Sequence, residues 1–353
     1  MRKGKRLVAW IMAVVMLFTI CVFGGNGTAE AAAATPVAKH GRLSVKGADL
    51  VDSKGNKFQL RGISTHGINW DVGSPYVNKK AFKTLRDDWG VNAIRLAMYT
   101  EEYNGYCSGG SQAKLRKLVD KGVGYATDLG MYAIIDWHIL SDGNPNKNKS
   151  QAKKFFTTMA KKYKNNKNVI YEICNEPNGC SWKEIKSYAT DIIKTIRKYD
   201  KKAVIIVGTP TWSQLGTDGT SNEVADSPIK GYKNIMYSLH FYASEWAHNE
   251  YLPAKVAYAR KKKLPIIVSE FGLSPASGDG AINKASADKW MKLLNKYNIS
   301  YFCWSLSNKN ESASLLKPST KKISGWKSGD LSTAGKYIKK KYLARKKALG
   351  KKA

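Results

Sequence analysis

Apolar, β-branched runs recur along the whole chain. They predict eight strands, at residues 60–64, 91–97, 131–137, 169–174, 203–208, 235–240, 265–270 and 300–304. Segments with helical periodicity lie between them, at residues 79–89, 112–129, 152–164, 182–199, 251–263 and 284–297. Because strands and helices alternate and the strands are almost continuously apolar, the pattern predicts the α/β class and a parallel sheet closed into a (β/α)8 TIM barrel.

A different pattern precedes the first of these strands. Residues 43–51 alternate between apolar and polar, residues 52–55 read Asp-Ser-Lys-Gly, and residues 57–60 follow. This order predicts an N-terminal β-hairpin, which we expect to close the lower end of the barrel. The connection after Gly208 is rich in Gly and Ser with little periodicity, so its helix is the one least marked in the sequence.

The first 34 residues have the composition of a leader. Basic residues at positions 2, 3, 5 and 6 precede an apolar run over residues 7–23, and small residues at 29–34 offer an Ala-x-Ala cleavage site. The run is slightly shorter than the roughly 20 residues of a membrane span. We therefore expect a signal peptide at 1–34 and a secreted protein, with an uncleaved anchor as the alternative. Residues 35–335 then form one barrel domain and 336–353 a basic C-terminal tail.

The chain is strongly basic, with 59 Lys and Arg against 27 Asp and Glu and a net charge of +32. Removing residues 1–34 takes away four basic residues and one acidic residue, which leaves 55 against 26, or +29. The lysines are spread over the chain without a recognised nucleic-acid module, so we expect no nucleic-acid partner. Association with an anionic cell wall or surface is the alternative, with the nine basic residues of 336–353 as the candidate segment. We expect a monomer.

Five cysteines are too few for a disulfide framework in a chain of this length. Cys21 lies in the leader, and Cys174 and Cys303 lie in apolar runs that predict buried thiols. Cys107 and Cys180 lie in loops expected on one face of the barrel. Both a bridge between them and two free thiols are compatible with the sequence.

Polar residues collect where the expected strands end, which is where barrel enzymes place their chemistry. Two of them are Glu176 and Glu270, which lie 94 residues apart, or about three strand–helix units. They should therefore end strands four and seven, on opposite sides of the barrel mouth. Glycoside cleavage needs such a pair, one acid to protonate the leaving oxygen and one carboxylate to meet the charge at the anomeric carbon. No spacing of Cys and His suggests a metal site and no glycine-rich phosphate loop is present, so we expect no cofactor.

Several segments resemble glycoside hydrolase family 5, in its bacterial endo-β-1,4-glucanase branch. The two strongest read Tyr-Glu-Ile-Cys-Asn-Glu-Pro at residues 171–177 and Ile-Val-Ser-Glu-Phe-Gly at residues 267–272. Further similar segments lie at residues 64–70, 94–99, 135–139, 238–242 and 304–306, and the resemblance runs in order from about residue 41 to 326. It implies a retaining β-glycanase that acts by double displacement.

The resemblance assigns the catalytic roles residue by residue. Glu176 becomes the proton donor and base, and Glu270 the nucleophile. Arg95 is expected to pair with Glu270 and keep it ionised, and the Asn175 amide to donate to the sugar 2-hydroxyl. Glu176 should lie in a less cationic and more desolvated setting.

The remaining site residues support the carboxylates or bind sugar. His240 and Tyr242 lie two apart in one strand and should project to the same side, His240 toward either glutamate and Tyr242 toward Glu270 or the sugar ring oxygen. The resemblance implies that sugar contacts come from His66, Trp70, Tyr99, His138, Trp212, Trp304, Lys309 and Glu311. Pro210 stands where the branch more often has glycine, which leaves the position of Trp212 open.

The expected substrate is a β-1,4-glucan. Subsite loops rather than the two glutamates select the glycan, so mannan, xyloglucan and mixed-linkage glucan are alternatives within the family. A barrel that binds carbohydrate as a surface adhesin without cleaving it is the alternative outside enzymology.

Overall fold

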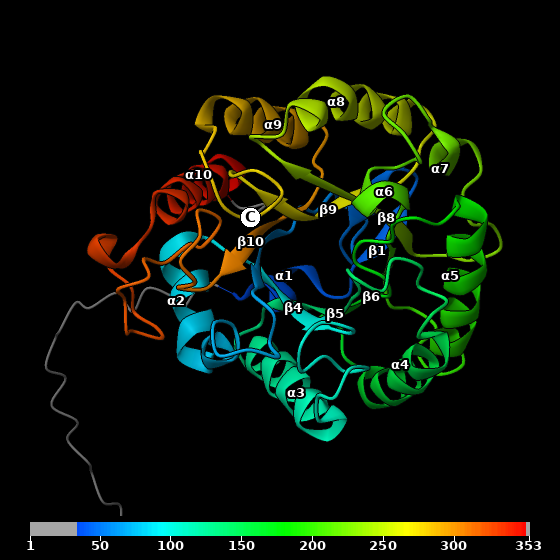
Figure 1. Cartoon of the computed structure of the whole chain (residues 1–353), viewed down its shortest axis with the longest axis horizontal. Helices are drawn as coiled ribbons and strands as arrows, with labels where there is room; N and C mark the ends of the chain where they lie inside the picture. Colours follow the sequence, from blue (N-terminus) through cyan, green and yellow to red (C-terminus); the bar gives the residue numbers. More distant parts are fainter. Residues whose placement is uncertain (1–33, 351–353) are drawn as a thin grey trace, which may run out of the picture. The chain divides into compact units, whose positions relative to one another are not determined.

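The eight expected strands close into one parallel barrel in a computed structural model that describes residues 34–350 (Figure 1). Neighbouring strands pair in the order β10-β3-β4-β5-β6-β7-β8-β9, which confirms the TIM-barrel prediction. The strands are β3 (Arg61–Thr65), β4 (Ala93–Tyr99), β5 (Tyr132–His138), β6 (Val169–Glu172), β7 (Ile205–Val207), β8 (Ile235–Tyr242), β9 (Ile266–Gly272) and β10 (Tyr301–Leu306).

Helices cover the outside of the barrel (Figure 1). The long ones are α2 (Lys79–Trp89), α3 (Gln112–Asp128), α4 (Lys149–Tyr163), α5 (Trp182–Arg197), α8 (Trp246–Lys261), α9 (Lys284–Lys296) and α10 (Thr333–Leu349). Between β7 and β8 the chain forms only α6 (Pro210–Ser213) and α7 (Glu223–Asp226), as the weak periodicity there suggested. Short 3-10 turns occupy Ser74–Tyr76 and Ser328–Asp330.

The start of α8 was predicted wrongly. The periodic pattern begins at residue 251, but the helix begins at Trp246 and contains Pro253. Proline removes one backbone donor and normally marks a first turn, so the sequence favours a later start. Other helix starts carry clear signals, such as the capping box of Ser181 and Glu184 at α5.

Alternate residues of the strands point into the barrel, and their character changes from one end to the other. At the lower end they form an apolar cluster that includes Tyr132, Ile134, Ile206 and Phe302. Two residues further along β5, the same face carries Asp136 and then His138, both buried. Each strand therefore contributes apolar core side chains near its N-terminal end and polar side chains near its C-terminal end.

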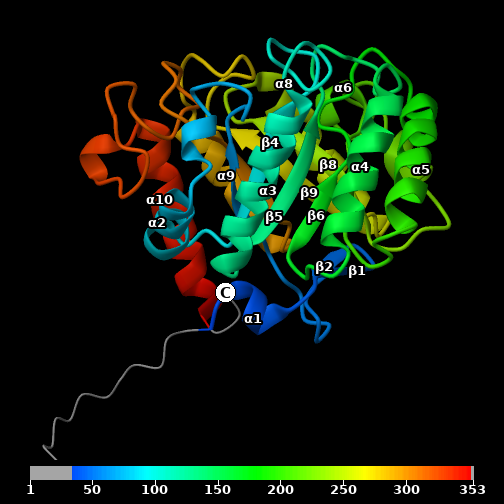
Figure 2. The same cartoon turned by 90° about the horizontal axis from the view of Figure 1, so that it is seen from below.

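The N-terminal hairpin lies beneath the barrel, together with α1 (Pro36–His40) (Figure 2). It consists of β1 (Ser44–Lys46) and β2 (Asp49–Val51), so its tight turn falls at Gly47 rather than at residues 52–55. Gly47 has φ 59°, which suits glycine. The chain bends again at 52–56 and pairs Val51 with Lys57. Leu43, Leu50, Phe58 and Leu60 join the lower apolar cluster, which confirms that this segment closes the barrel.

Both ends of the chain bear on earlier expectations. The expected signal peptide lies outside the described residues, apart from Ala34. Helix α10 runs through residue 336 without a break, and its Tyr337, Ile338 and Tyr342 are buried, so most of the basic segment is barrel helix. No helix within residues 34–350 is long and apolar enough to cross a bilayer.

Cys107 and Cys180 are free thiols, so the bridge between them is not formed.

Candidate active site

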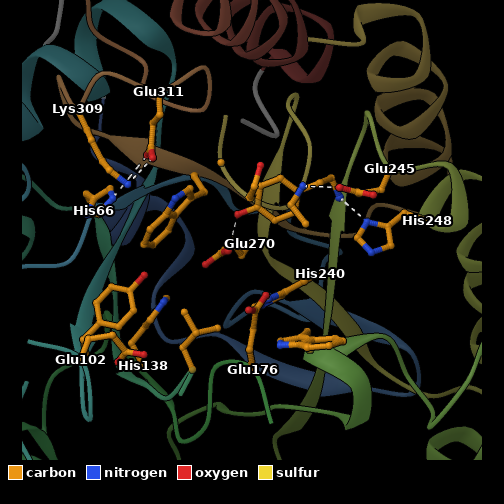
Figure 3. A pocket seen from close by; sticks show the side chains of 18 of the residues that line it. His66, Glu102, His138, Glu176, His240, Glu245, His248, Glu270, Lys309 and Glu311 are labelled. Carbon is orange, nitrogen blue, oxygen red and sulfur yellow. Dashed lines mark hydrogen bonds and ion pairs between the residues drawn. The ribbon is translucent and has the colours of Figure 1, made fainter. Parts of the chain in front are cut away.

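A cleft of about 550 Å³ opens at the C-terminal ends of the strands. Figure 3 shows Glu176 and Glu270 near its middle, with Lys309 and Glu311 toward one end and Glu245 and His248 toward the other. Side chains from the connections after β3, β4, β5, β7, β9 and β10 also line the cleft. The full set of lining residues is His66, Trp70, Tyr99, Glu102, His138, Leu140, Glu176, Trp212, Gln214, His240, Tyr242, Glu245, His248, Glu270, Ala276, Ser277, Gly278, Trp304, Lys309 and Glu311.

Glu270 lies in β9 with both carboxylate oxygens hydrogen bonded. Arg95 donates to Oε2 at 2.8 Å, and the Tyr242 hydroxyl donates to Oε1 at 2.8 Å. The expected pairing with Arg95 is confirmed, and the choice left open for Tyr242 falls on Glu270. A guanidinium partner favours the charged form of a carboxylate. Glu270 is thus held in place by a cationic and a neutral donor, one on each oxygen.

Glu176 follows β6 and has different surroundings. One of its oxygens, one oxygen of Glu270 and a ring nitrogen of His240 all lie within 4.8 Å of one another. Burial raises the pKa of Glu176 to about 8, with Asp136 and Glu172 adding to the rise against the opposing effect of Arg95. Glu176 is therefore protonated at neutral pH, in agreement with the desolvated setting expected for it.

His240 supports Glu176 from β8. Its Nδ1 lies 2.8 Å from Glu176 Oε1, and its Nε2 lies 2.9 Å from Ser269 Oγ. Burial lowers the pKa of His240 to about 4, so the ring is neutral at pH 7. A neutral ring with its proton on Nε2 donates to Ser269 Oγ and, at Nδ1, accepts a hydrogen bond from the protonated Glu176 carboxyl. Of the two glutamates open to it, His240 thus holds Glu176.

A buried charge network lies directly below the two glutamates. Arg95, with no exposed surface, contacts Glu172 at 2.7 Å and Asp136 at 3.0 Å as well as Glu270. Burial raises the pKa of Asp136 to about 8 and raises that of Glu172. Three carboxyl groups thus share one guanidinium, and the burial of the lower two favours their protonated forms.

Asn175 is fully buried beside this network. Its Oδ1 accepts a hydrogen bond from Arg95 at 2.5 Å, while its Nδ2 donates to the Ile139 carbonyl and lies 3.2 Å from His138 Nε2. Asn175 does not line the cleft. Its contact with a sugar 2-hydroxyl stays a prediction, and in this structure the side chain links Arg95 to His138.

Aromatic rings form one end of the cleft. Trp304 of β10 stacks on His138 with ring centroids 5.2 Å apart and lies 5.1 Å from His66. Tyr99 lies 4.6 Å from Trp70 and 4.1 Å from His138. All five residues expected from the sequence to bind sugar in this part of the cleft are thus brought together. Aromatic faces of this kind match the apolar face of a pyranose ring.

Lys309 and Glu311 complete that end. Lys309 Nζ lies 2.5 Å from Glu311 Oε2, and His66 Nε2 lies 3.6 Å from Glu311 Oε1. Burial acts against ionisation of Glu311, but its attraction to His66 and Lys309 outweighs burial and lowers the pKa of Glu311. The three side chains offer fixed donors and acceptors for sugar hydroxyls.

Trp212 lies at the Glu176 side of the cleft and is 44% exposed. Three consecutive residues, Thr211, Trp212 and Ser213, have positive φ of 57°, 52° and 63°. Such backbone is strained in residues other than glycine and persists where its surroundings enforce it. Here Trp212 N donates to the Pro177 carbonyl, and Ser213 Oγ donates to the Asn175 carbonyl. The loop that holds Trp212 is therefore tied to the loop that holds Glu176, which settles its position.

Some site residues were missed by the sequence analysis. Asp136 and Glu172 have the period-two signal of inward strand positions, since Asp136 lies two residues before His138. Both could have been predicted by following the inward-facing positions two residues back toward the start of each strand. Glu102, Gln214, Glu245 and His248 come from loops and a helix end, where no periodicity marks them.

Within residues 34–350, Glu176, His240 and Glu270 form a group whose donor atoms are close enough to hold a metal ion. These atoms already have partners, however. Arg95 and Tyr242 donate to Glu270, and the two ring nitrogens of His240 face Glu176 and Ser269. A cation here would face the Arg95 guanidinium and displace these bonds. The set fits hydrogen-bonded acid–base chemistry better, and the expected absence of a metal stays a prediction.

Comparison with known proteins adds independent evidence. Residues 51–310 match the family model described as cellulase (glycosyl hydrolase family 5). The chain is 46% identical over 341 residues to an endoglucanase of Clostridium saccharobutylicum and 45% identical over 325 residues to endoglucanase 5 of Pectobacterium carotovorum subsp. carotovorum. These alignments cover 95% and 92% of this chain, and 72% and 62% of the two relatives.

A solved structure is similar over nearly the whole barrel. It is the catalytic domain of Thermobifida fusca endoglucanase Cel5A in complex with cellotetraose, 37% identical, with a TM-score of 0.81. The match covers 88% of this chain and 100% of that one. Sequence and fold thus agree on the same group of relatives.

Proposed function

Because the chain belongs to the cellulase family, glycosyl hydrolase family 5, we propose that it is an endo-β-1,4-glucanase that cleaves internal bonds with retention of configuration. The observation that carries this is the pair Glu176 and Glu270, whose oxygens approach within 4.8 Å in one cleft. Carboxyl groups about 5–5.5 Å apart leave no room for a water between them and the sugar, which is the retaining arrangement. The relatives named endoglucanases support the substrate class.

In the first step Glu270 attacks the anomeric carbon as a carboxylate. Arg95 and Tyr242 orient its oxygens before attack. Glu176 protonates the glycosidic oxygen as it leaves, because its raised pKa keeps the carboxyl group protonated at neutral pH. The products are a glycosyl ester on Glu270 and a free sugar chain on the leaving side.

In the second step Glu176, now a carboxylate, takes a proton from water. The resulting hydroxide-like oxygen attacks the anomeric carbon, and the bond to Glu270 breaks. At this stage the neutral His240 ring carries its proton on Nδ1 and donates to the Glu176 carboxylate, while the Ser269 hydroxyl donates to Nε2, so Glu176 stays aimed at the same position. Both residues return to their starting protonation states.

The direct test is a substrate panel. Initial rates on carboxymethylcellulose, barley glucan, mannan, xyloglucan and xylan, with the anomer of the first product read by NMR, should show the highest rate on a β-1,4-glucan and a β-anomer product. A highest rate on mannan or xyloglucan would move the proposal to another glycan of the family. Binding without turnover on every glycan would favour the adhesin alternative.

Secretion and surface association are further parts of the proposal. They are supported by the leader composition, the net charge of +32 and a C-terminal helix rich in lysine. Lys340, Lys346 and Lys347 have no ion pair within the described residues. Exchanging these three for Gln should weaken binding to anionic cell walls at low salt, and equal binding would remove this part. Light scattering tests the expected monomer.

A further inference from the structure

The exposed aromatic side chains are unevenly distributed over the molecule. Six large hydrophobic side chains are exposed within residues 34–350, and four of them are aromatic. Three of these four, Trp212 (44% exposed), Trp246 (68%) and Tyr251 (37%), come from α6 and from the first turns of α8. Exposure of large apolar rings to water is unfavourable, so a group of such rings in one region indicates a binding surface.

Trp246 and Tyr251 form a pair on α8. Their ring centroids lie 5.8 Å apart with planes at 82°. The Tyr251 ring lies against Gly219, where an added Cβ would come within 2.9 Å of it, so no side chain separates the ring from that loop. Lys255 fixes the same loop to α8 by donating to the Gln214 carbonyl at 3.1 Å. The pair is therefore positioned by its surroundings although it is exposed to solvent.

The pair lies next to residues of the cleft, although neither of its two rings lines the cleft itself. Glu245 and His248, on either side of Trp246 in sequence, both line it. His248 Nε2 lies 3.1 Å from Gln214 Nε2, which joins the start of α8 to the loop that carries Trp212. Figure 3 places Glu245 and His248 on the side of the two catalytic candidates away from Lys309 and Glu311. The aromatic surface thus extends the cleft on the Trp212 side.

The position of Glu176 determines which half of the substrate reaches this surface. Glu176 protonates the leaving oxygen, and the loop of Trp212 is bonded to the loop of Glu176. The leaving chain therefore runs past Trp212 toward α8. We propose that Trp246 and Tyr251 form a distal subsite that binds glucose units of the leaving chain beyond those next to the cleaved bond. This inference rests on the proposed glucanase function and specifies its preference for long chains.

Chain length is the test. The ratio of kcat/KM on cellohexaose to that on cellotetraose is measured for the wild type, Trp246→Ala, Trp246→Phe and Tyr251→Ala. Loss of one stacking ring should lower this ratio roughly five- to tenfold in Trp246→Ala. Trp246→Phe should restore part of the ratio because it keeps an aromatic face. Tyr251→Ala should lower it less, since its ring is about half as exposed as that of Trp246.

Leu343→Ala is the matched control, because Leu343 is 38% exposed on α10 and should not alter the ratio. An unchanged ratio in Trp246→Ala, or an equal fall on both substrates, would overturn the distal subsite. A wild type that cleaves neither oligosaccharide would instead overturn the glucanase function itself. The two failures are therefore distinguishable in one experiment.

Discussion

The two ends of the barrel interior are built from the same strands and have opposite character. The lower end is an apolar cluster in which Ile134, Ile206 and Phe302 pack above the hairpin. The upper end buries Arg95 with Asp136, Glu172 and Glu270. The difference separates two tasks, because apolar burial stabilises the fold while buried charge costs stability and perturbs pKa values.

This division predicts that substitutions at the two ends have different consequences. At the upper end, activity should respond more strongly than stability. At the lower end, stability should respond and the chemistry of the folded protein should not. Arg95 lies between these cases, since it both neutralises the buried carboxyl groups and orients Glu270.

The largest expected effect belongs to Glu270→Gln. Without the carboxylate no glycosyl ester can form, so kcat should fall by about 10⁴-fold or more, while the midpoint of thermal unfolding changes little. Steady-state hydrolysis and calorimetry on the same preparation measure both quantities. A variant that keeps more than about a hundredth of the wild-type kcat would refute Glu270 as nucleophile.

Arg95→Met should affect both properties. The variant leaves three carboxyl groups without their cation, so the free energy of unfolding should fall by about 3–5 kcal/mol and kcat should fall as well. Arg95→Lys keeps the charge but not the fork that reaches Glu172, Asp136, Asn175 and Glu270 together, so it should recover stability more than kcat. Urea unfolding and initial rates test this. Equal recovery of both would mean that the charge alone matters.

Phe302→Ala is the counterpart at the lower end. Phe302 is fully buried and lies so close to Gly62 that a Cβ there would meet its ring at 1.9 Å. Its truncation should lower the free energy of unfolding by about 3–5 kcal/mol and leave kcat within about twofold at a temperature where the variant is folded. A large loss of kcat without loss of stability would contradict the division between the two ends.

Much of this division was visible in the sequence. The strands, their order and the two glutamates follow from apolar runs that end in polar residues, because a closed parallel barrel makes both patterns regular. The pairing of Arg95 with Glu270 was expected from the family resemblance, and the contact is present.

The rest depends on contacts that no local pattern encodes. Whether His240 faces Glu176 or Glu270 depends on the packing of β8 against β9, whose register shifts between Ser238 and His240. Trp212 is held by hydrogen bonds to a loop about 35 residues earlier in the chain. Trp246 lies in a turn of α8 that precedes the periodic segment, and the hairpin turn at Gly47 competed with a second turn-like sequence at residues 52–55.

The smallest expected effect concerns the pH dependence of kcat/KM, and it distinguishes the role of Glu176 from that of Glu270. Glu176 acts as an acid only while protonated, so with a pKa of about 8 the alkaline limb of kcat/KM should fall near that pH and decline tenfold per unit above it. Asp136 contributes to the raised pKa, so Asp136→Asn should lower it and move the limb to lower pH. Glu102→Gln, which removes a carboxylate that lines the cleft but does not contribute to this shift, should leave the limb in place. Profiles of kcat/KM between pH 5 and 10 test this, and a limb that stays fixed in Asp136→Asn would show that Asp136 does not help to raise the pKa of Glu176.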